Sequence, residues 1–244
     1  MSVLAVIPAR YASTRLPAKP LVDLGGQPLI WRVYEAVSGC SSIDRVVVAT
    51  DDLRIQSRVQ ELGGDCLMTS TTHQSGTDRI AEVSAQLPEY DYVLNVQGDE
   101  PFVQSDQLEA IIALLKQGAQ IATLARQIDS TQAIFSEQLV KLVLAKDGRA
   151  LYFSRSPIPF LRDTAREEWV QKGLHYQHLG LYGFNRETLT ALTRIPVSSL
   201  EQAEKLEQLR WLQEGFEIRV ALTTHQGIGI DTPEDLENAR KLFA

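Results

Sequence analysis

Three cations stand close together near the start of the chain, in the stretch "IPARYASTRLPAKPL" at residues 7–21. They are Arg10, Arg15 and Lys19, and small or hydroxylated residues such as Ser13 lie between them. Guanidinium and ammonium groups, together with the backbone N–H groups of a strand-to-helix turn, are what a polyphosphate requires. The stretch fits neither G-x-x-x-x-G-K-[ST] nor G-x-G-x-x-G, which argues against P-loop NTPases and nicotinamide enzymes. We expect a phosphate-binding loop, with a plain surface loop as the alternative.

Two acidic motifs lie far apart in the sequence. Asp99 and Glu100, in "VQGDEPF", directly follow an apolar run that we expect to be a strand. Carboxylates at such a position suit Mg²⁺, which binds through one or two carboxylates plus substrate phosphates. A solvated acidic turn is the alternative. Taken alone, Asp231 in "GIGIDTPED" is best interpreted as a residue that merely flanks a helix. A role as a metal ligand is favoured only if Asp99 needs a second carboxylate.

A third motif, "TSTTHQSGTDRIAEV", predicts the start of a helix at Ser75 and Gly76, with Arg79 one turn inside it. A helix N-terminus beside an arginine favours an anion. We interpret His73, in the same stretch, as a loop residue rather than a ligand.

Two further stretches carry polar side chains that could bind a ligand. In "HLGLYGF", His178, Gly180 and Tyr182 share one face of a strand by their period of two. The helical stretch "LEQAEKLEQLRWL" carries Glu204, Glu207 and Gln208. A polar helix face in solvent is ordinary, whereas a buried row of hydrogen-bonding groups is not, so exposure decides between the two interpretations.

Alternating strands and helices must position these motifs. Five runs predict strands: "VLAVI" from Val3, "RVVVAT" from Arg45, "DCLM" from Asp65, "YVLNVQ" from Tyr92 and "IATLA" from Ile121. Amphipathic segments predict helices between them at 29–37, 53–62, 77–87 and 107–116. Strands that are apolar throughout are typical of a parallel sheet covered on both faces. We therefore expect a doubly wound α/β fold, with ligands at the carboxyl ends of the strands.

The alternation changes after residue 127. A hairpin is expected around Asp147 and Gly148, then a strand from His178, a helix over 200–212 and a strand from 217. Thr232 is the expected N-cap of the last helix, with Pro233 as its first residue. We expect a single domain, with a core of about 1–127 and 216–244 and an insertion of about 128–215.

Composition narrows the choice of partners. The 244 residues include 24 Lys and Arg against 31 Asp and Glu, a formal net charge of −7. Nucleic acid and anionic membranes both need a net basic face, so neither is an expected partner. The two cysteines lack zinc-ligand spacing, and no apolar run approaches ~20 residues. We expect the N-terminal stretch not to be a signal peptide, because it has no basic region before its short apolar run. A reducing cytoplasm is the simplest interpretation.

Seven motifs occur in order along nearly the whole chain: "IPARYASTRLPAKPL", "QSGTDRIAEV", "NVQGDEPF", "ALYFSRSPIP", "HLGLYGF", "LEQLR" and "DTPEDLE". Together they closely resemble the 3-deoxy-manno-octulosonate cytidylyltransferases, the CMP-Kdo synthetases of Gram-negative bacteria. The first motif alone is shared loosely with acylneuraminate cytidylyltransferases, whereas the seven together are specific. One departure is Ala18, which stands where this family commonly has glycine.

The resemblance implies that CTP and Kdo give CMP-Kdo and pyrophosphate with Mg²⁺, for the inner core of lipopolysaccharide. The anomeric hydroxyl of the sugar would attack the α-phosphate in line. The implied fold is the nucleotide-diphospho-sugar transferase form of a doubly wound, mostly parallel sheet, with an inserted region for sugar binding and dimerisation. The implied assembly is a homodimer. Rival functions are transfer to a related sugar acid, such as 8-amino-Kdo or sialic acid, and nucleotide sensing without catalysis.

The resemblance also implies roles for individual residues. Catalysis would fall to Arg15, Lys19 and Asp99, and Mg²⁺ to Asp99 and Asp231. The nucleotide would contact Arg10, Ser13, Arg15, Lys19, Ser75, Gly76 and Gln97. The sugar acid would contact Arg79, Arg155, His178, Tyr182, Glu207 and Gln208.

Overall fold

The computed structural model describes residues 1–12 and 16–242. The chain forms two compact units: the first comprises Met1–Ile112 and Gly227–Ala244, and the second comprises Ala113–Gln226. The expected insertion at about 128–215 lies within the second unit, whose bounds are wider. The core and insertion boundaries near 127 and 216 stay a prediction.

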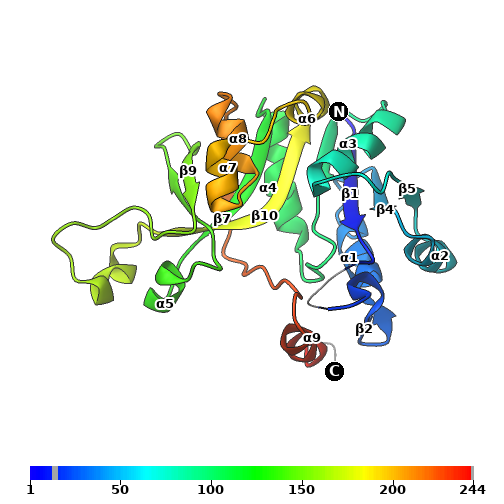
Figure 1. Ribbon diagram of the computed structural model, residues 1–244, viewed down its shortest axis with the longest axis horizontal. Coiled ribbons are helices and arrows are strands. Elements are labelled where there is room, and N and C mark those ends of the chain that lie inside the picture. The colour runs from blue at the N-terminus through cyan, green and yellow to red at the C-terminus, as the bar shows by residue number, and fades with distance from the viewer. Residues whose placement is uncertain (13–15, 243–244) are drawn as a thin grey trace. The chain divides into compact units, whose positions relative to one another are not determined.

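The first unit contains four parallel strands in the order β6 (Tyr92–Asn95), β1 (Val3–Ala9), β4 (Arg45–Thr50) and β5 (Cys66–Met68) (Figure 1). β1 lies in the middle, with Val3 opposite Tyr92 on one side and Leu4 opposite Arg45 on the other. Most residues of β1, β4 and β6 are fully buried. The prediction of apolar, parallel strands is confirmed for this unit.

Helices follow the strands as the amphipathic segments predict. They are α1 (Leu29–Ser38), α2 (Leu53–Glu61), α3 (Gly76–Gln86), α4 (Ser105–Lys116), most of which belongs to this unit, and α9 (Pro233–Arg240). The shorter elements are η1 (Lys19–Leu21), β2 (Asp23–Leu24) and β3 (Gln27–Pro28). Within 1–12 and 16–242, none of the helices has both the length and the apolar character needed to cross a bilayer.

The C-terminal segment packs against the beginning of the chain. Leu236 and Ala239 of α9 belong to a buried apolar cluster that also contains Leu24 and Leu29, and α9 lies beside β2 in Figure 1. Thr232 caps α9 with a capping box and Pro233 is its first residue, as predicted. Just before this helix, the backbone N–H of Ile230 donates to the carbonyl of Asp99 at 2.9 Å. This return of the chain carries Asp231 to the end of β6.

The second unit has five strands: β7 (Ile121–Gln127), β8 (Lys141–Leu144), β9 (Ala150–Ser154), β10 (Tyr176–Asn185) and β11 (Ile218–Leu222). β7 pairs in parallel with β11 and antiparallel with β10. β8 and β9 form the predicted hairpin, and Gly148 takes a φ of 82° in its turn. The helical elements are α5 (Thr131–Phe135), η2 (Arg166–Glu168), η3 (Val170–Lys172), α6 (Arg186–Leu192), α7 (Ser199–Glu204) and α8 (Gln208–Gln213).

The single helix expected over 200–212 is wrong, because the chain forms two helices there. Lys205 adopts a left-handed conformation with a φ of 55°, and this conformation ends α7. The N–H of Lys205 still donates to the carbonyl of Glu201. The apolar residues keep a helical spacing on both sides of this break, so the period alone does not reveal it. As a consequence, Glu207 and Gln208 stand at the start of α8.

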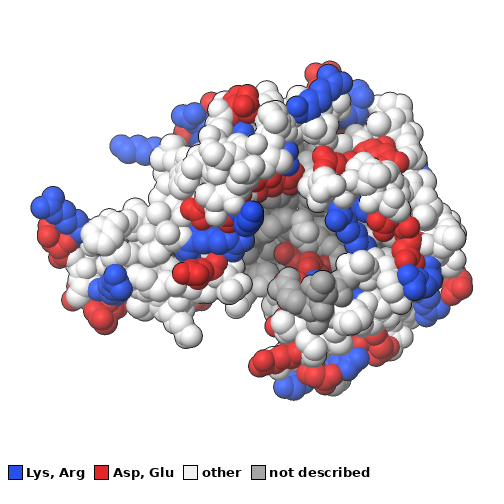
Figure 2. Space-filling model, in the orientation of Figure 1, with Lys and Arg blue, Asp and Glu red and all other residues white. Residues whose placement is uncertain are grey.

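Charges of both signs are interleaved on the surface. Figure 2 shows basic and acidic side chains close to one another across the visible face of the described residues. Exposed ion pairs of the described residues include Arg58–Glu61 and Arg149–Asp147. Exposed pairs of this kind contribute little to stability, about 0–1 kcal/mol each.

Two glycines near Pro8 give a matched test of packing. A Cβ on Gly98 would lie 2.8 Å from the Pro8 carbonyl oxygen, whereas a Cβ on Gly76 would lie 3.6 Å from Pro8 Cγ. We expect Gly98→Ala to lower the free energy of unfolding by about 1–3 kcal/mol, since rigid backbone must move. Gly76→Ala is expected to stay within about 0.5 kcal/mol of the parent, as ordinary surface changes do. Urea denaturation measures both, and equal effects would contradict this packing.

Candidate active site

A cavity of about 340 Å³ opens in the first unit where β1 and β6 end. Its walls are the end of β1, the described part of the loop that follows β1, the residues after β6 and the segment before α9. The lining residues are Pro8, Ala9, Arg10, Ala12, Lys19, Pro20, Gln97, Gly98, Asp99 and Asp231. The predicted phosphate loop and both acidic motifs therefore meet in one place. A cavity of about 610 Å³ in the second unit is lined by none of the predicted site residues.

Lys19 bridges the two predicted metal ligands. Its Nζ lies 2.6 Å from Asp99 Oδ2 and 2.8 Å from Asp231 Oδ1, and the lysine side chain is only 13% exposed. Two carboxylate oxygens thus converge on one cation, and this donor set fits Mg²⁺ completed by substrate phosphates. Among the described residues, no group of three or more His, Cys, Asp and Glu side chains could hold a metal by itself. Any metal bound here must take further ligands from elsewhere.

Glu100 is the neighbouring carboxyl group. Burial and, to a smaller extent, the charge of Asp99 raise its pKa to about 7, although the charge of Lys19 acts in the opposite direction. The two carboxylates that line the cavity, Asp99 and Asp231, thus face a single described ammonium group, and added positive charge would be stabilised there.

Ala18 gives a physical reason why glycine is common at its position. The residue precedes η1 with a φ of 53° and a ψ of 28°, which is the left-handed region. A residue with a Cβ pays roughly 1–2 kcal/mol there, whereas glycine adopts this region freely. The turn that places Lys19 is therefore slightly strained in this chain.

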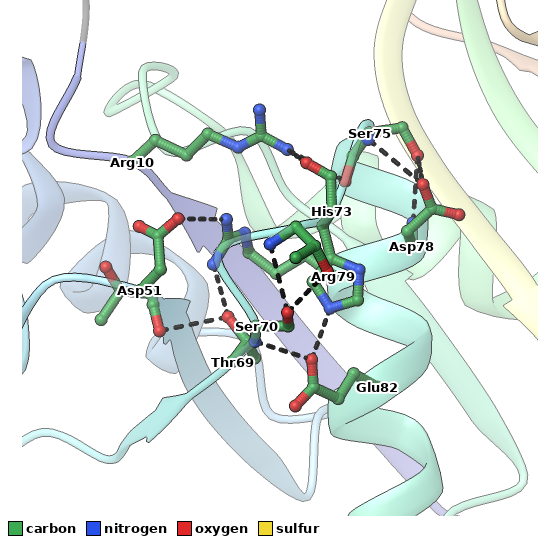
Figure 3. A network of polar contacts seen from close by, with 11 residues as sticks. Arg10, Asp51, Thr69, Ser70, His73, Ser75, Asp78, Arg79 and Glu82 are labelled. Atoms are coloured by element: carbon green, nitrogen blue, oxygen red, sulfur yellow. Dashed lines mark hydrogen bonds and ion pairs between the residues drawn. The ribbon is translucent and has the colours of Figure 1, made fainter.

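The predicted helix start is confirmed, and Arg10 lies against it. Ser75 caps α3 in a capping box with Asp78, and Gly76 is the first helical residue. Arg10 Nη2 donates to the carbonyl of His73 at 2.7 Å, and the carbonyl of Ser75 lies 3.5 Å away (Figure 3). Two separate parts of the predicted nucleotide site thus adjoin.

Arg79 requires a correction. Its side chain is fully buried, Nη2 lies 2.8 Å from Asp51 Oδ2, and Nη1 donates to the hydroxyl of Thr69 (Figure 3). The carboxylate of Asp51 therefore neutralises this guanidinium inside the first unit. The structure does not support the predicted contact of Arg79 with a sugar acid, and we interpret the residue as structural.

His178 and Tyr182 lie on the same side of β10, as their spacing predicts. Their ring centroids are 5.2 Å apart, although the pairing of β10 with β7 shifts between Leu179 and Tyr182. The shift adds two residues to β10, which preserves the alternation of its faces. His178 Nε2 lies 3.0 Å from Thr123 Oγ1, so the imidazole is also fixed by β7.

Burial keeps this pair neutral. It lowers the pKa of His178 to about 3. Burial, assisted by the Glu207 carboxylate, raises the pKa of Tyr182 well above its ordinary value. The phenol oxygen has no hydrogen-bond partner among the described residues. A buried phenol in this state is a donor that a ligand could satisfy.

The other predicted sugar residues lie in the same unit. Gln208 is buried, and Glu207 Oε1 accepts from Arg210 Nη2 at 2.8 Å. Arg155 donates through Nε to the carbonyl of Glu204 and through Nη1 to the carbonyl of Glu137. Carbonyls orient a guanidinium without cancelling its charge, so Arg155 keeps the character that a carboxylate ligand needs.

Two predicted residues, Ser13 and Arg15, lie outside the described residues. Sequence reasoning also missed a candidate, Trp211, whose ring packs edge-on to Tyr182 at 5.3 Å. Its buried Nε1 has no hydrogen-bond partner in the described part of the chain. An isolated tryptophan on a helix is ordinarily a core residue, so its type and spacing carried no signal.

Comparisons with known proteins identify the family of this chain. A family model described as cytidylyltransferase matches residues 4–218. A relative from Phocaeicola vulgatus, named 3-deoxy-manno-octulosonate cytidylyltransferase, is 50% identical over 244 residues, with 98% of this chain and 96% of the relative covered. A relative of the same name from Thermodesulfovibrio yellowstonii is 46% identical over 249 residues, with 99% of this chain and 98% of the relative covered.

Solved structures extend the likeness to the fold. CMP:2-keto-3-deoxy-manno-octonic acid synthetase, in complex with CTP, is 40% identical with a TM-score of 0.93, covering 99% of this chain and 98% of that one. A 4-diphosphocytidyl-2C-methyl-D-erythritol synthase from Anaerococcus prevotii, 16% identical with a TM-score of 0.63, shares the fold alone. Because the likeness runs through nearly the whole chain at 40–50% identity, the chain belongs to the 3-deoxy-manno-octulosonate cytidylyltransferase family.

Proposed function

We propose that this protein transfers CMP from CTP to Kdo and releases pyrophosphate, as the names of its relatives indicate for them. A bond forms between the anomeric oxygen of the sugar and the α-phosphorus, the bond to pyrophosphate breaks, and the proton of the hydroxyl passes to solvent water. The observation that carries the proposal is that Lys19, Asp99 and Asp231 meet in one cavity, where β1 and β6 end. Positioning and charge neutralisation are the main requirements of such a reaction.

The nucleotide is assigned to the first unit. Arg10 lies at the rim of the cavity against the start of α3, where Gly76 presents the backbone N–H group of the first helical residue, whereas the N–H of Ser75 donates to Asp78 Oδ2 at 3.2 Å. Such groups and cations favour phosphates. Gln97 lines the same cavity. Ser13 and Arg15 are assigned to the triphosphate by family resemblance.

Asp99 and Asp231 are the residues that would hold Mg²⁺. When bound, Mg²⁺ supplies charge neutralisation on the phosphates and can lower the pKa of the attacking hydroxyl. An ammonium group and a divalent ion cannot occupy the same point between two carboxylates. Lys19 therefore exchanges the carboxylates for the distal phosphates of CTP when substrate binds. Lys19 thus neutralises the two carboxylates before CTP binds and contacts the phosphates afterwards.

The sugar acid is assigned to the second unit. Tyr182 and Gln208, which are buried, and His178, which is partly buried, provide neutral hydrogen-bonding groups, which suit a polyhydroxylated sugar better than a triphosphate. Arg155 is a charged partner for the sugar carboxylate. Buried polar groups that the wrong ligand leaves without a partner give selectivity, at about 1–3 kcal/mol each.

The proposal extends to the setting of the reaction. We place the enzyme in the cytoplasm as a homodimer that supplies CMP-Kdo for lipopolysaccharide. Both cysteines are free and buried, as in a reducing compartment. Leu174 and Leu222 are more than half exposed and line an apolar groove of the second unit, which is consistent with a subunit contact. A related sugar acid remains the alternative substrate.

The first test is release of pyrophosphate from CTP with Mg²⁺, compared for Kdo, 8-amino-Kdo and sialic acid. We expect Kdo to be preferred and Asp99→Asn to lower kcat by about 10²–10³-fold, equivalent to ~3–4 kcal/mol, by analogy with oxyanion-hole donors. Asp163→Asn is the control, because that side chain is 89% exposed. Preference for another sugar would change the substrate, and near-normal turnover of Asp99→Asn would remove Asp99 from the site.

A second test separates the sugar residues from the nucleotide residues. His178→Ala and Gln208→Ala are expected to raise the KM for the sugar or lower kcat. The Kd for CTP alone should stay within about threefold, less than the ~1.4 kcal/mol of a tenfold change. Gln213→Ala, on the exposed end of α8, is the control, and thermal denaturation reports folding. Loss of CTP binding with normal sugar kinetics would show that this assignment is wrong.

A further inference from the structure

Glu82 connects α3 to the loop that precedes it. The residue lies on α3, and its Oε2 accepts from the backbone N–H of Ser70 at 2.9 Å and contacts His73 Nε2 (Figure 3). Ser70 is itself linked to Thr72 through their hydroxyl groups at 2.7 Å. One carboxylate oxygen therefore holds the loop at two points, and the position of His73 depends on it.

The same loop determines where Arg10 lies. His73 uses its ring to contact Glu82 and its carbonyl to accept from Arg10 Nη2 at 2.7 Å. Two consecutive contacts thus run from the Glu82 carboxylate to the Arg10 guanidinium (Figure 3). The last acceptor is a backbone carbonyl, which orients the guanidinium without cancelling its charge.

The charge on Glu82 favours this arrangement. The hydrogen bond from Ser70 lowers its pKa, and the hydrogen bond and charge of His73 and the charge of Arg79 lower it further, against partial burial. The side chains of His73 and Glu82 are 18% and 31% exposed, so solvent competes only in part for their contact. Arg79, which is fixed by Asp51, lies on the same helix as Glu82, and its positive charge stabilises the Glu82 carboxylate.

We propose that Glu82 and His73 are positioning residues for nucleotide binding: they hold the loop carbonyl that aims Arg10 at the phosphates of CTP. This inference rests on the proposed function, in which Arg10 contacts the triphosphate. It assigns to His73 a role that its place in a loop does not suggest. Neither residue touches the reacting atoms.

A double-mutant cycle tests the proposal in the full-length protein. Glu82→Ala is expected to raise the KM and the calorimetric Kd for CTP about fivefold, with kcat within twofold of the parent. Glu82→Gln keeps an oxygen acceptor for Ser70 but removes the charge, so its effect should lie between those of the parent and of Glu82→Ala. Arg10→Ala should weaken CTP binding by itself. In the Arg10→Ala background, Glu82→Ala should have less than a 1.5-fold further effect, because the residue it positions is gone.

His73→Ala keeps the backbone carbonyl but removes the ring, and it should reproduce about half or more of the Glu82→Ala effect. It is the second variant should Glu82→Ala fold poorly in a thermal melt. Glu61→Ala is the matched control, since this carboxylate lies on the exposed surface of α2. An undiminished effect of Glu82→Ala in the Arg10→Ala background, or unchanged CTP binding in Glu82→Ala or in His73→Ala, would overturn the proposal. Unchanged CTP binding in Arg10→Ala would instead remove Arg10 from the proposed nucleotide site.

Discussion

The ammonium group of Lys19 joins parts of the chain that are 80 and 212 residues away from it in sequence. Without this cation, the carboxylates of Asp99 and Asp231 would lie close together in a partly buried cavity and repel each other. Other contacts in the first unit position these side chains. The Ile230–Asp99 hydrogen bond and the apolar cluster beneath α9 bring the second carboxylate into place. The site therefore depends on folding of both chain ends into one unit.

A lysine suits an exchangeable counter-ion. Its ammonium is compact and lies at the end of a flexible stem, whereas a guanidinium would bind carboxylates in a more rigid, bidentate way. A cation already present lowers the cost of holding two carboxylates at the geometry that a metal–phosphate complex needs. Arg10 differs from Lys19, since backbone carbonyls orient its guanidinium without cancelling its charge, which suits the phosphate contact proposed for it. The two cations thus have different roles within one cavity.

Local patterns in the sequence predict most of the fold. Apolar runs locate the strands, and the capping sequences locate the starts of α3 and α9. The break at Lys205 was missed because a left-handed lysine leaves no mark on the hydrophobic period. The position of Asp99 after a strand follows from the topology of a parallel sheet, so that part of the site was also predictable, whereas Asp231 was assigned through the family resemblance.

Partners distant in sequence were not predictable. Arg79 looks like an anion ligand until Asp51, 28 residues away, is seen to neutralise it. His73 looks like an ordinary loop residue until its contact with Glu82 is known. For Lys19, the sequence suggested phosphate binding but not the ion pairs with Asp99 and Asp231. In each case the residue types were informative, whereas the choice among possible partners required three-dimensional structure.

The central claim is that Lys19 occupies the point that a divalent cation takes when CTP binds. Titration of Mn²⁺ followed by electron paramagnetic resonance, with the parent protein and Lys19→Met, tests it directly. Without nucleotide, Lys19→Met is expected to bind Mn²⁺ at least about fivefold more tightly, which is ~1 kcal/mol, because a competing charge has been removed. With CTP the order should reverse, since the variant lacks a phosphate ligand. Equal or weaker Mn²⁺ binding by the variant without nucleotide would contradict the account.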